Sequence, residues 1–226
     1  MATFQRARSD EQREQRRQAI LSTAAQMLGE MPVAELSLNE LSRRVGLAKS
    51  NVLRYFETRE AVLLELHDTA WRAWLDRLDS TLPPAEAESD TRTRYERVAA
   101  ALTASLVADP LVCELISVSA SVLERNISPE VARRHKLASI SNIDRMAAQL
   151  RSSLPELSGD GAWRAAGVIL LSVAGLWPLT NPTEAMLCVY EDPQLARMRL
   201  DFPTALEDVL SMILAGCLSR WPSIPG

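Results

Sequence analysis

Apolar residues recur every three or four positions along most of this chain, and that spacing restricts what it can fold into. One helical stripe, for example, is formed by Ile20, Ala24, Met27, Leu28 and Met31. No good run of alternating Val, Ile and Thr, the pattern of a strand, is found. Aromatic residues make up only 5% of the chain, whereas the strong helix formers Ala, Leu, Arg and Glu are abundant. The sequence therefore predicts an all-α protein.

Helix start and stop signals divide this pattern into elements. After a polar tail at 1–9, long helices are predicted over about 11–31, 59–81, 91–108, 111–125, 129–153, 161–178 and 203–219. Ser128 and Pro129 mark one clear start, with Ser as the cap and Pro at the first helical position. Connections are expected at 81–90, at 153–161 and at 178–203, the last with short helical turns near 184–190 and 193–199.

Two short helices joined by a turn are predicted between the first two long ones. Ser37 and Glu40 form a capping box, in which the Ser37 hydroxyl accepts from the Glu40 N–H and the Glu40 side chain can reach back. Gly46 supplies the backbone freedom that a sharp reversal needs. Residues 48–56 make the second short helix, and Thr58 caps the long helix that follows. This arrangement describes a helix-turn-helix.

The two faces of this helix-turn-helix differ in chemistry. An apolar face that locks the pair onto the first helix is formed by Leu38, Leu41, Val45, Val52 and Phe56. Polar groups suited to phosphates and base edges cluster at the second short helix and its exit: Lys49, Ser50, Asn51, Arg54, Tyr55 and Arg59. Because a helix fits the major groove of duplex DNA, residues of about 37–59 are predicted to grip DNA. A helical hairpin that merely packs is the alternative.

The same residues resemble the DNA-binding segment of the TetR family of bacterial transcription regulators. The resemblance is carried by Arg17, Ile20, Leu21, Ala24, Ala25 and Leu28, by Leu36–Leu41, by Val45–Phe56 and by Arg59–Leu63. It implies an N-terminal three-helix helix-turn-helix domain followed by a helical-bundle domain for ligand binding and dimerisation. It also implies roles for single residues. Ser37 can touch a phosphate, Tyr55 and Arg59 clamp phosphates, and the groove is entered by Lys49, Ser50 and Asn51.

Three positions depart from the family pattern. Arg59 stands where the family usually has Lys, and it preserves the charge. Leu53 replaces a Tyr whose hydroxyl commonly reaches DNA, so it can instead meet a thymine methyl or simply pack. Ala48 replaces a small capping residue, often Ser, and forgoes a cap worth about 1 kcal/mol. Asn51 and Arg54 are candidate base readers, with phosphate contact or solvent exposure as the alternatives.

Charge is distributed unevenly along the chain. The net charge is −4, but residues 1–60 hold 10 basic and 8 acidic side chains, whereas the remainder holds 15 and 21. This asymmetry suits a basic N-terminal module on an acidic body. We therefore expect a DNA-binding domain at 1–60, a connecting helix at 59–81 and a regulatory and dimerisation domain at 82–226. The charge-rich segment 6–17 is interpreted as a solvated face, with a minor role at phosphates as the alternative.

Motifs of other protein classes are missing from the sequence. It contains no G-x-S-x-G, P-loop, H-E-x-x-H or Cys-His constellation, so we expect no enzyme activity and no cofactor. His67 and His135 stand alone, which predicts no metal site. The free thiols predicted to be buried in a reducing cytosol are Cys113, Cys188 and Cys217.

The sequence also predicts a cytoplasmic protein without membrane contact. Its charged N-terminus excludes a secretory signal. We expect no membrane-spanning helix, because no uninterrupted stretch contains the roughly 18 apolar residues that a span needs. Residues 168–179 come closest, but this stretch is short and contains Pro178.

The body offers candidates for core, ligand and dimer contacts. Trp71 and Trp74 are expected in the core. The candidate residues of a small-molecule pocket are Trp163, Trp177, Arg125, Met186 and Tyr190. The alternative is core packing for the apolar residues and a helix end for the Arg125 position. Helices 161–178 and 203–219 contain small residues, and by the resemblance they pair with their symmetry mates in a four-helix dimer interface. Internal core is the alternative for both helices.

These features together predict a DNA-binding transcription regulator. We expect a homodimeric repressor that an unknown small-molecule effector releases from a palindromic double-stranded DNA operator. A dimer is needed because one short reading helix contacts too few base pairs for specific binding. The alternative is a helix-turn-helix protein without small-ligand control, either partner-controlled or architectural. Activation in place of repression stays open, since the sequence does not encode promoter position.

Overall fold

The computed structural model describes residues 2–85, 89–119 and 123–223, with side chains from Glu11 onward. Over these residues the regular elements are helices, and β-pairing is limited to one isolated bridge between Leu157 and Pro222. The predicted all-α class is confirmed. The chain forms two compact units, one of Met1–Thr69 with Val118–His135 and the other of Ala70–Ser117 with Lys136–Gly226. We refer to them as unit 1 and unit 2.

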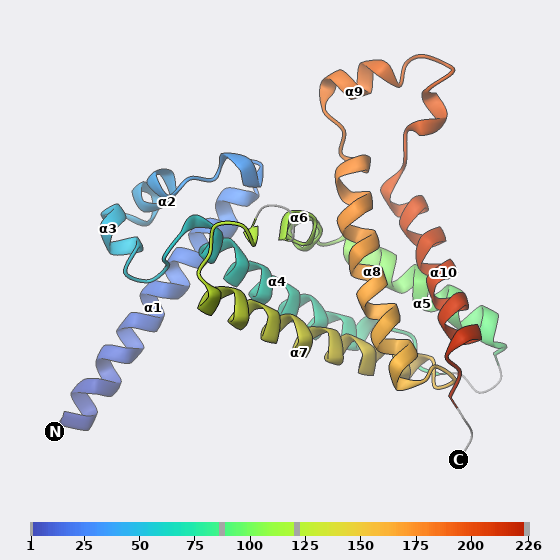
Figure 1. Cartoon of the computed structure of the whole chain (residues 1–226), viewed down its shortest axis with the longest axis horizontal. Helices are drawn as coiled ribbons and strands as arrows, with labels where there is room; N and C mark the ends of the chain where they lie inside the picture. Colours follow the sequence, from blue (N-terminus) through green and yellow to red (C-terminus); the bar gives the residue numbers. More distant parts are fainter. Residues whose placement is uncertain (1, 86–88, 120–122, 224–226) are drawn as a thin grey trace. The chain divides into compact units, whose positions relative to one another are not determined.

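Unit 1 begins with the long helix α1 (Ala2–Leu28) and continues through η1 (Val33–Glu35), α2 (Leu38–Val45) and α3 (Lys49–Val52) into α4 (Arg59–Thr81) (Figure 1). The predicted apolar stripe of α1 is buried, with Ile20, Ala24 and Met27 at 0% exposure. The helix begins at Ala2, well before the predicted start near residue 11. Residues 2–10 contain neither Gly nor Pro, so nothing in the sequence stops the helix from continuing through them.

The helix-turn-helix has the predicted apolar side. Leu41, Val52 and Phe56 are buried, whereas Leu38 and Val45 are half-buried. Gly46 ends α2 in the left-handed conformation with a φ of 73°, which a side chain would disfavour. The turn between α2 and α3 therefore forms where the sequence places it.

Helix α3 is shorter than the predicted span of 48–56. It ends at Val52, and the chain continues through turns in which Arg54 N–H donates to Asn51 O at 3.2 Å and Tyr55 N–H to Val52 O at 2.9 Å. Ala48 occupies its N-cap and makes no side-chain cap hydrogen bond. The missing cap predicted from Ala48 is therefore observed, and an uncapped short helix has little to extend it.

Unit 2 is a bundle built mainly from α5 (Thr91–Val107), α6 (Pro110–Val118), α7 (Pro129–Ser153), α8 (Gly159–Thr180) and α10 (Phe202–Arg220), with the second half of α4. Helix α10 packs against α5 and α8. Trp71 and Trp74 lie in the core as predicted, and Trp74 Nε1 donates to Ser105 Oγ at 3.1 Å.

Helix α6 ends at Val118, earlier than the predicted residue 125. Within the predicted span, residues 120–122 lie outside the described residues, and Glu124–Asn126 form a turn and bends. Ser119 and Leu123 are π-helical, and Glu124 N–H donates to Ser119 O at 3.2 Å, so α-helical hydrogen bonding is replaced there by the wider π pattern. Helix α7 begins at Pro129 as predicted, with Ser128 Oγ accepting from Val131 N–H at 3.3 Å.

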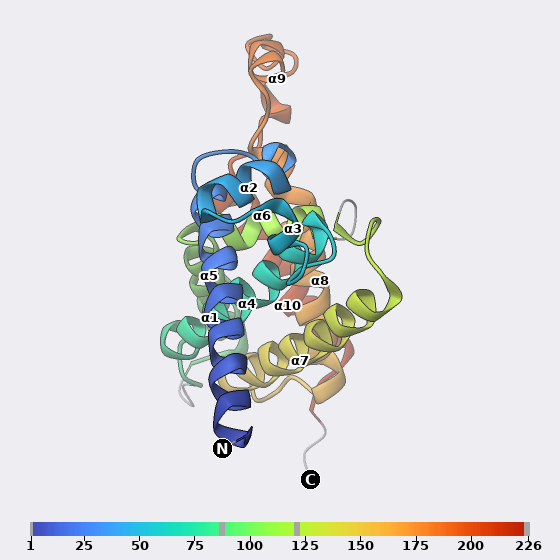
Figure 2. The ribbon, with the colours of Figure 1, turned by 90° about the vertical axis from the view of Figure 1, so that its left-hand side faces the viewer.

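A segment at 181–201 joins α8 to α10 and extends beyond the ends of both helices (Figure 1, Figure 2). It contains α9 (Glu184–Val189) and η3 (Ala196–Met198), near the short turns that the sequence predicts, and neither has a buried residue. Cys188 on α9 is exposed, so its predicted burial is wrong, whereas Cys113 and Cys217 are buried. Burial raises the pKa of the Cys113 thiol to about 12.

The prediction that no stretch is long and apolar enough to span a membrane is wrong for two helices. Helices α8 and α10 each contain an 18-residue window, with mean hydropathy of 1.4 and 1.3, that is long and apolar enough to cross a membrane by length and composition. Neither helix is an uninterrupted apolar run, because Arg164 and Pro178 interrupt α8 and the adjacent Glu207 and Asp208 interrupt α10. About a third of each window is buried within the chain, so both helices expose apolar surface.

Candidate nucleic-acid interface

Helix α3 presents a polar face to solvent. Lys49, Ser50 and Asn51 are exposed, whereas the next residue, Val52, is wholly buried and holds the helix in place. Leu53 at 40% exposure and Arg54 follow on the exposed side, and Tyr55 is half-buried. The structure thus brings together the polar residues that the sequence predicts at the second short helix.

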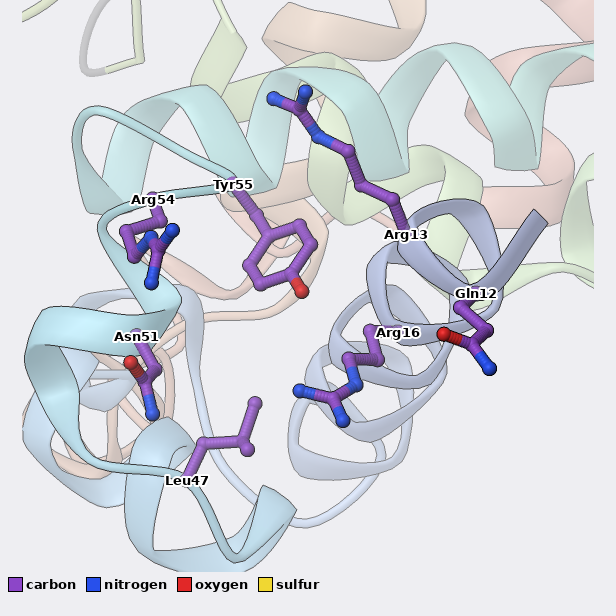
Figure 3. A pocket seen from close by; sticks show the side chains of 7 residues that line it. All are labelled: Gln12, Arg13, Arg16, Leu47, Asn51, Arg54 and Tyr55. Atoms are coloured by element: carbon purple, nitrogen blue, oxygen red, sulfur yellow. The ribbon is translucent and has the colours of Figure 1, made fainter. Parts of the chain in front are cut away.

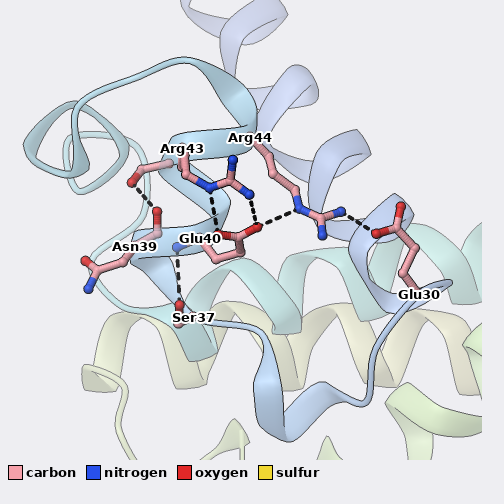
Figure 4. A network of polar contacts seen from close by, with 7 residues as sticks. Glu30, Ser37, Asn39, Glu40, Arg43 and Arg44 are labelled. Carbon is pink, nitrogen blue, oxygen red and sulfur yellow. Dashed lines mark hydrogen bonds and ion pairs between the residues drawn. The ribbon is translucent and has the colours of Figure 1, made fainter.

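Helix α2 is fixed at its start by Ser37. The Ser37 Oγ accepts from Glu40 N–H at 3.2 Å, which forms half of the predicted capping box (Figure 4). The other half is not formed, because the Glu40 carboxylate accepts from Arg43 Nε and Arg44 Nε, each at 2.9 Å. Arg44 also pairs with Glu30 near the end of α1 at 2.5 Å. These hydrogen bonds from Arg43 and Arg44 lower the pKa of Glu40 to about 2.

Arg59 is held within unit 1 by its own neighbours. Its guanidinium donates to the Leu36 carbonyl at 2.5 Å and to the Val33 carbonyl, and it lies 3.2 Å from the Glu60 carboxylate. These contacts tie the first turn of α4 to the chain that precedes α2. A phosphate contact by Arg59 stays a prediction, because three groups of the chain already engage this side chain.

Arg17 is a positioning residue whose role the sequence did not reveal. Its guanidinium pairs with the Glu65 carboxylate, with Nε 2.6 Å from Oε1, and donates to the Tyr55 carbonyl at 3.1 Å. It also lies 4.6 Å from the centroid of the Phe56 ring. Arg17 thus connects α1, the exit of α3 and α4. The only sequence signal for this role was its place in the family resemblance.

The segment 123–131 adds a contact to the helix-turn-helix that the sequence did not predict. The Glu57 carboxylate, just after α3, accepts from the Ser128 N–H at 2.7 Å. This hydrogen bond from the Ser128 backbone is the largest cause that lowers the pKa of Glu57. The start of α7 is therefore tied to the end of the helix-turn-helix within unit 1.

The five predicted ligand contacts are scattered. Trp163 on α8 is 46% exposed, and Trp177 lies fourteen residues on, about 21 Å along the helix. Trp177 Nε1 donates to Glu114 Oε2 at 2.8 Å, and its ring packs edge-on against Phe202 with centroids 5.0 Å apart.

The other three lie elsewhere. Met186 on α9 and Tyr190 at its end belong to the extending segment of unit 2, whereas Arg125 is exposed in unit 1. Three surface clefts of the described residues, lined by side chains within 12–55, 79–153 and 17–134, include none of these five residues. A shared ligand site for the five residues stays a prediction.

Comparison with known proteins covers both units. A family model described as "Bacterial regulatory proteins, tetR family" matches residues 20–66, and one described as "Tetracyclin repressor-like, C-terminal domain" matches residues 68–220. The HTH-type transcriptional regulator EthR of Mycobacterium tuberculosis strain H37Rv is 40% identical over 50 residues, 22% of this chain. That match spans only 23% of the length of EthR.

Solved structures share the fold over most of the chain. A TetR-family transcriptional regulator from Pectobacterium atrosepticum superposes with a TM-score of 0.56 at 14% identity, covering 96% of this chain and 98% of that one. The regulator FadR from Bacillus subtilis, in complex with stearoyl-CoA, superposes with a TM-score of 0.52 at 12% identity, covering 88% of this chain and 98% of that one. At such identities the likeness concerns the fold alone.

The match to residues 68–220 spans more than half of the chain, and the match to residues 20–66 coincides with the helix-turn-helix described above. The chain therefore belongs to the TetR family of DNA-binding bacterial transcription regulators.

Proposed function

We propose that the chain is a cytoplasmic homodimeric repressor that binds a palindromic operator through α3 and is released by a small molecule. The observation that carries the DNA-binding part is the display of Lys49, Ser50 and Asn51 beside the buried anchor Val52. A short helix braced in this way can enter the major groove while its neighbours hold the phosphate backbone. The residues at 1–60 act as the DNA-binding head.

The candidate contact residues of the head suit different parts of duplex DNA. Lys49 and the Tyr55 hydroxyl suit phosphates, whereas the Asn51 amide and the Arg54 guanidinium suit base edges. Leu53 offers an apolar contact for a thymine methyl, and phosphate contacts are also proposed for Ser37, Ser50 and Arg59.

Helices α8 and α10 support dimerisation. Leu171 on α8 is 72% exposed and Met212 on α10 is 65% exposed, although both are large and apolar. A Cβ added at Gly167, Gly175 or Gly216 would meet nothing within 4 Å, so these helix faces are open to close approach. An exposed apolar surface of this kind marks an interaction site. We therefore infer that residues of about 161–178 and 203–219 pair with those of a second copy.

Dimerisation allows two heads to bind one operator. Two reading helices related by a twofold axis and spaced about 34–36 Å apart read both halves of a palindrome on one face of the duplex. One short helix alone contacts too few bases for that selectivity. The proposed interface in the body is thus a requirement for specific binding by the head.

Ligand control rests on the body and on its coupling to the head. FadR, which shares the fold, was crystallised with stearoyl-CoA, and this supports a small organic effector for unit 2 here. Helix α4 runs from unit 1 into unit 2, and the Ser128 N–H to Glu57 contact fixes a second segment to the head. A ligand that binds better to one arrangement of these segments shifts the population toward it.

The DNA-binding proposal can be tested without knowing the operator. Fluorescence anisotropy with a random-sequence duplex at low salt measures phosphate-dominated binding. We expect Lys49→Ala to weaken it severalfold, while Arg92→Ala on α5, a similarly exposed cation of the body, leaves it unchanged. Full retention of binding by Lys49→Ala would remove this residue from the interface, and a wild-type chain that ignores DNA would end the proposal.

The effector proposal needs a separate experiment. Mass spectrometry of compounds released from the purified, denatured chain identifies bound molecules, and anisotropy then shows whether each compound dissociates the DNA complex. Release by a compound that binds unit 2 supports a ligand-controlled repressor. A body that binds no compound, or a compound that binds without changing DNA affinity, favours control by a partner protein.

A further inference from the structure

A cleft of about 620 Å³ lies between α1 and the exit of α3 in unit 1. It is lined by Gln12, Arg13, Arg16, Leu47, Asn51, Arg54 and Tyr55 (Figure 3). In Figure 3 the Arg16 guanidinium and the Tyr55 hydroxyl point into the same space between the two elements. The cleft thus joins α1 side chains to residues of the predicted reading face. The sequence predicted a solvated face for these α1 side chains, with a minor role at phosphates as the alternative.

Helical periodicity explains why these α1 side chains face the cleft. Ile20, at 0% exposure, packs in the core, and Arg16 and Arg13 lie four and seven positions before it. Residues at these spacings share one face of a helix. The stripe of α1 that is apolar near the core therefore continues as arginine beyond it. Gln12 lies four positions before Arg16 and completes the rim.

No described residue that lines this cleft neutralises its positive charge. None of its described lining residues is acidic. Among the side chains described from Glu11 onward, Arg13, Arg16 and Arg54 form no ion pair. The neighbouring Arg17 differs, because Glu65 holds it. Uncompensated guanidinium groups that line one cleft, with hydroxyl and amide donors beside them, suit an anion with several acceptor oxygens.

We propose that this cleft is a binding site for a phosphate group, and that its occupant in the complex is a backbone phosphate of the bound duplex. The inference rests on the proposed function of the head. Asn51 and Arg54 belong both to the cleft and to the reading face, so a duplex engaged by α3 passes next to it. Arg13 and Arg16 hold the phosphate, and the Tyr55 hydroxyl and Gln12 amide donate further hydrogen bonds. Helix α1 thereby widens the head's footprint on DNA.

The test compares Arg16→Gln, Arg13→Gln and their double variant with Arg92→Gln in the full chain. On a duplex selected by the wild-type protein, we expect the double variant to bind roughly tenfold more weakly at moderate salt. The slope of log affinity against log salt should become shallower by about 0.9 for each phosphate that the variant no longer neutralises. Arg92→Gln, which removes a 77% exposed arginine of α5, should change neither quantity.

Two controls separate binding from folding. Arg16 is exposed, so Arg16→Gln should keep the wild-type midpoint of urea unfolding. Arg17→Gln should lower that midpoint, because it removes the contacts to Glu65 and Tyr55. Ethylation interference on the selected duplex adds a direct readout. The phosphate whose ethylation blocks the wild-type protein should become insensitive in the double variant.

The source of the phosphate is settled by titrating the free protein with inorganic phosphate, followed by phosphorus NMR. Unchanged DNA affinity, salt slope and interference pattern in the double variant overturn the proposal, whereas the proposed function of α3 stands if wild-type binding is intact. Tight binding of inorganic phosphate that the double variant abolishes, without any effect on DNA, also overturns it, since the cleft would then serve a free anion. Absence of any DNA binding by the wild-type chain would instead end the proposed function.

Discussion

His67 on α4 lies beside His135 on α7, with ring centroids 5.6 Å apart, and its side chain is only 4% exposed. The sequence alone indicated two isolated histidines, because nothing local in the chain shows that α4 and α7 meet there. Burial, with a smaller contribution from His135, lowers the pKa of His67 to about 3 from its ordinary value of 6.5. The folded chain therefore keeps His67 neutral at pH values where the unfolded chain protonates it.

This difference predicts a loss of stability in acid. The unfolded state binds the additional proton between pH 6.5 and about 3, so stability falls as the pH falls through that window. Between pH 7 and pH 5 the loss is on the order of 2 kcal/mol. Urea unfolding at both pH values should show a smaller loss for His67→Leu than for the wild type. Equal losses in the two proteins would contradict the assignment to His67.

Asn51 is the residue at which sequence reading and mere DNA affinity can be separated. Its amide is exposed on α3, so it can make a bidentate contact to adenine. Asn51→Ala should cost about 1–3 kcal/mol on a selected duplex and much less on a scrambled one. Gel-shift titrations on the two duplexes measure this difference. Equal losses on both would place Asn51 at the phosphate backbone.

Helix α3 is the shortest α-helix of the described residues, and no side chain caps its start. It covers only Lys49–Val52, and Ala48 at its N-cap has a φ of −64° and a ψ of 145°, the extended conformation that a capping residue adopts. A hydroxyl at this position could accept from the first orphan N–H groups of α3 without any backbone change. The element proposed to read DNA thus lacks a side-chain cap, although the backbone at Ala48 already has the conformation of a capping residue.

Ala48→Ser should stabilise the head by about 1 kcal/mol. In a chain of this size that corresponds to a rise of roughly 2–4 °C in the melting temperature, measured by circular dichroism. DNA affinity should rise as well, since less ordering is left to the binding step. Ala48→Val, which adds bulk without an acceptor, is the control. An equal rise for Val would show that the gain does not come from capping.

How far the sequence predicts an element depends on whether its signals are local. The starts of α2, α4 and α7 follow from Ser37, Thr58 and Ser128, because a capping side chain acts on its own first turn. The ends of α3 and α6 could not be predicted from such caps, because the hydrogen-bonding pattern changes after Val52 and after Val118 without a local stop signal. The polar face of α3 was predictable, because three polar residues precede one apolar anchor within a single helical turn. The Arg17 contacts and the cleft beside Arg16 were not, because they join segments far apart in the sequence.

At the scale of the whole molecule, α8 and α10 have apolar side chains that no other part of the same chain covers. Leu171 and Met212 are exposed to solvent in a single copy. Apolar windows of which only a third is buried resemble the exposed half of an interface. Both helices are long and apolar enough to cross a membrane by length and composition, and the proposed pairing with a second copy offers another cover for the same apolar surface.

Leu171→Glu combined with Met212→Glu should convert the dimer to a monomer, because a charge at the centre of the interface is left without a partner. Light scattering after size exclusion gives the mass, and circular dichroism should show unchanged helix content, since both side chains are exposed within one copy. Leu137→Glu, at a 50% exposed position on α7, should stay dimeric. A double variant that remains dimeric would move the interface elsewhere.

Selection of bound sequences from a pool of random duplexes, with the full wild-type chain, tests the head and its pairing together. We expect enrichment of an inverted repeat whose half-sites are centred about one helical turn, or a multiple of it, apart. Enriched sequences with a single half-site, or no enrichment over the starting pool at low salt, would contradict a paired reading head built on α3.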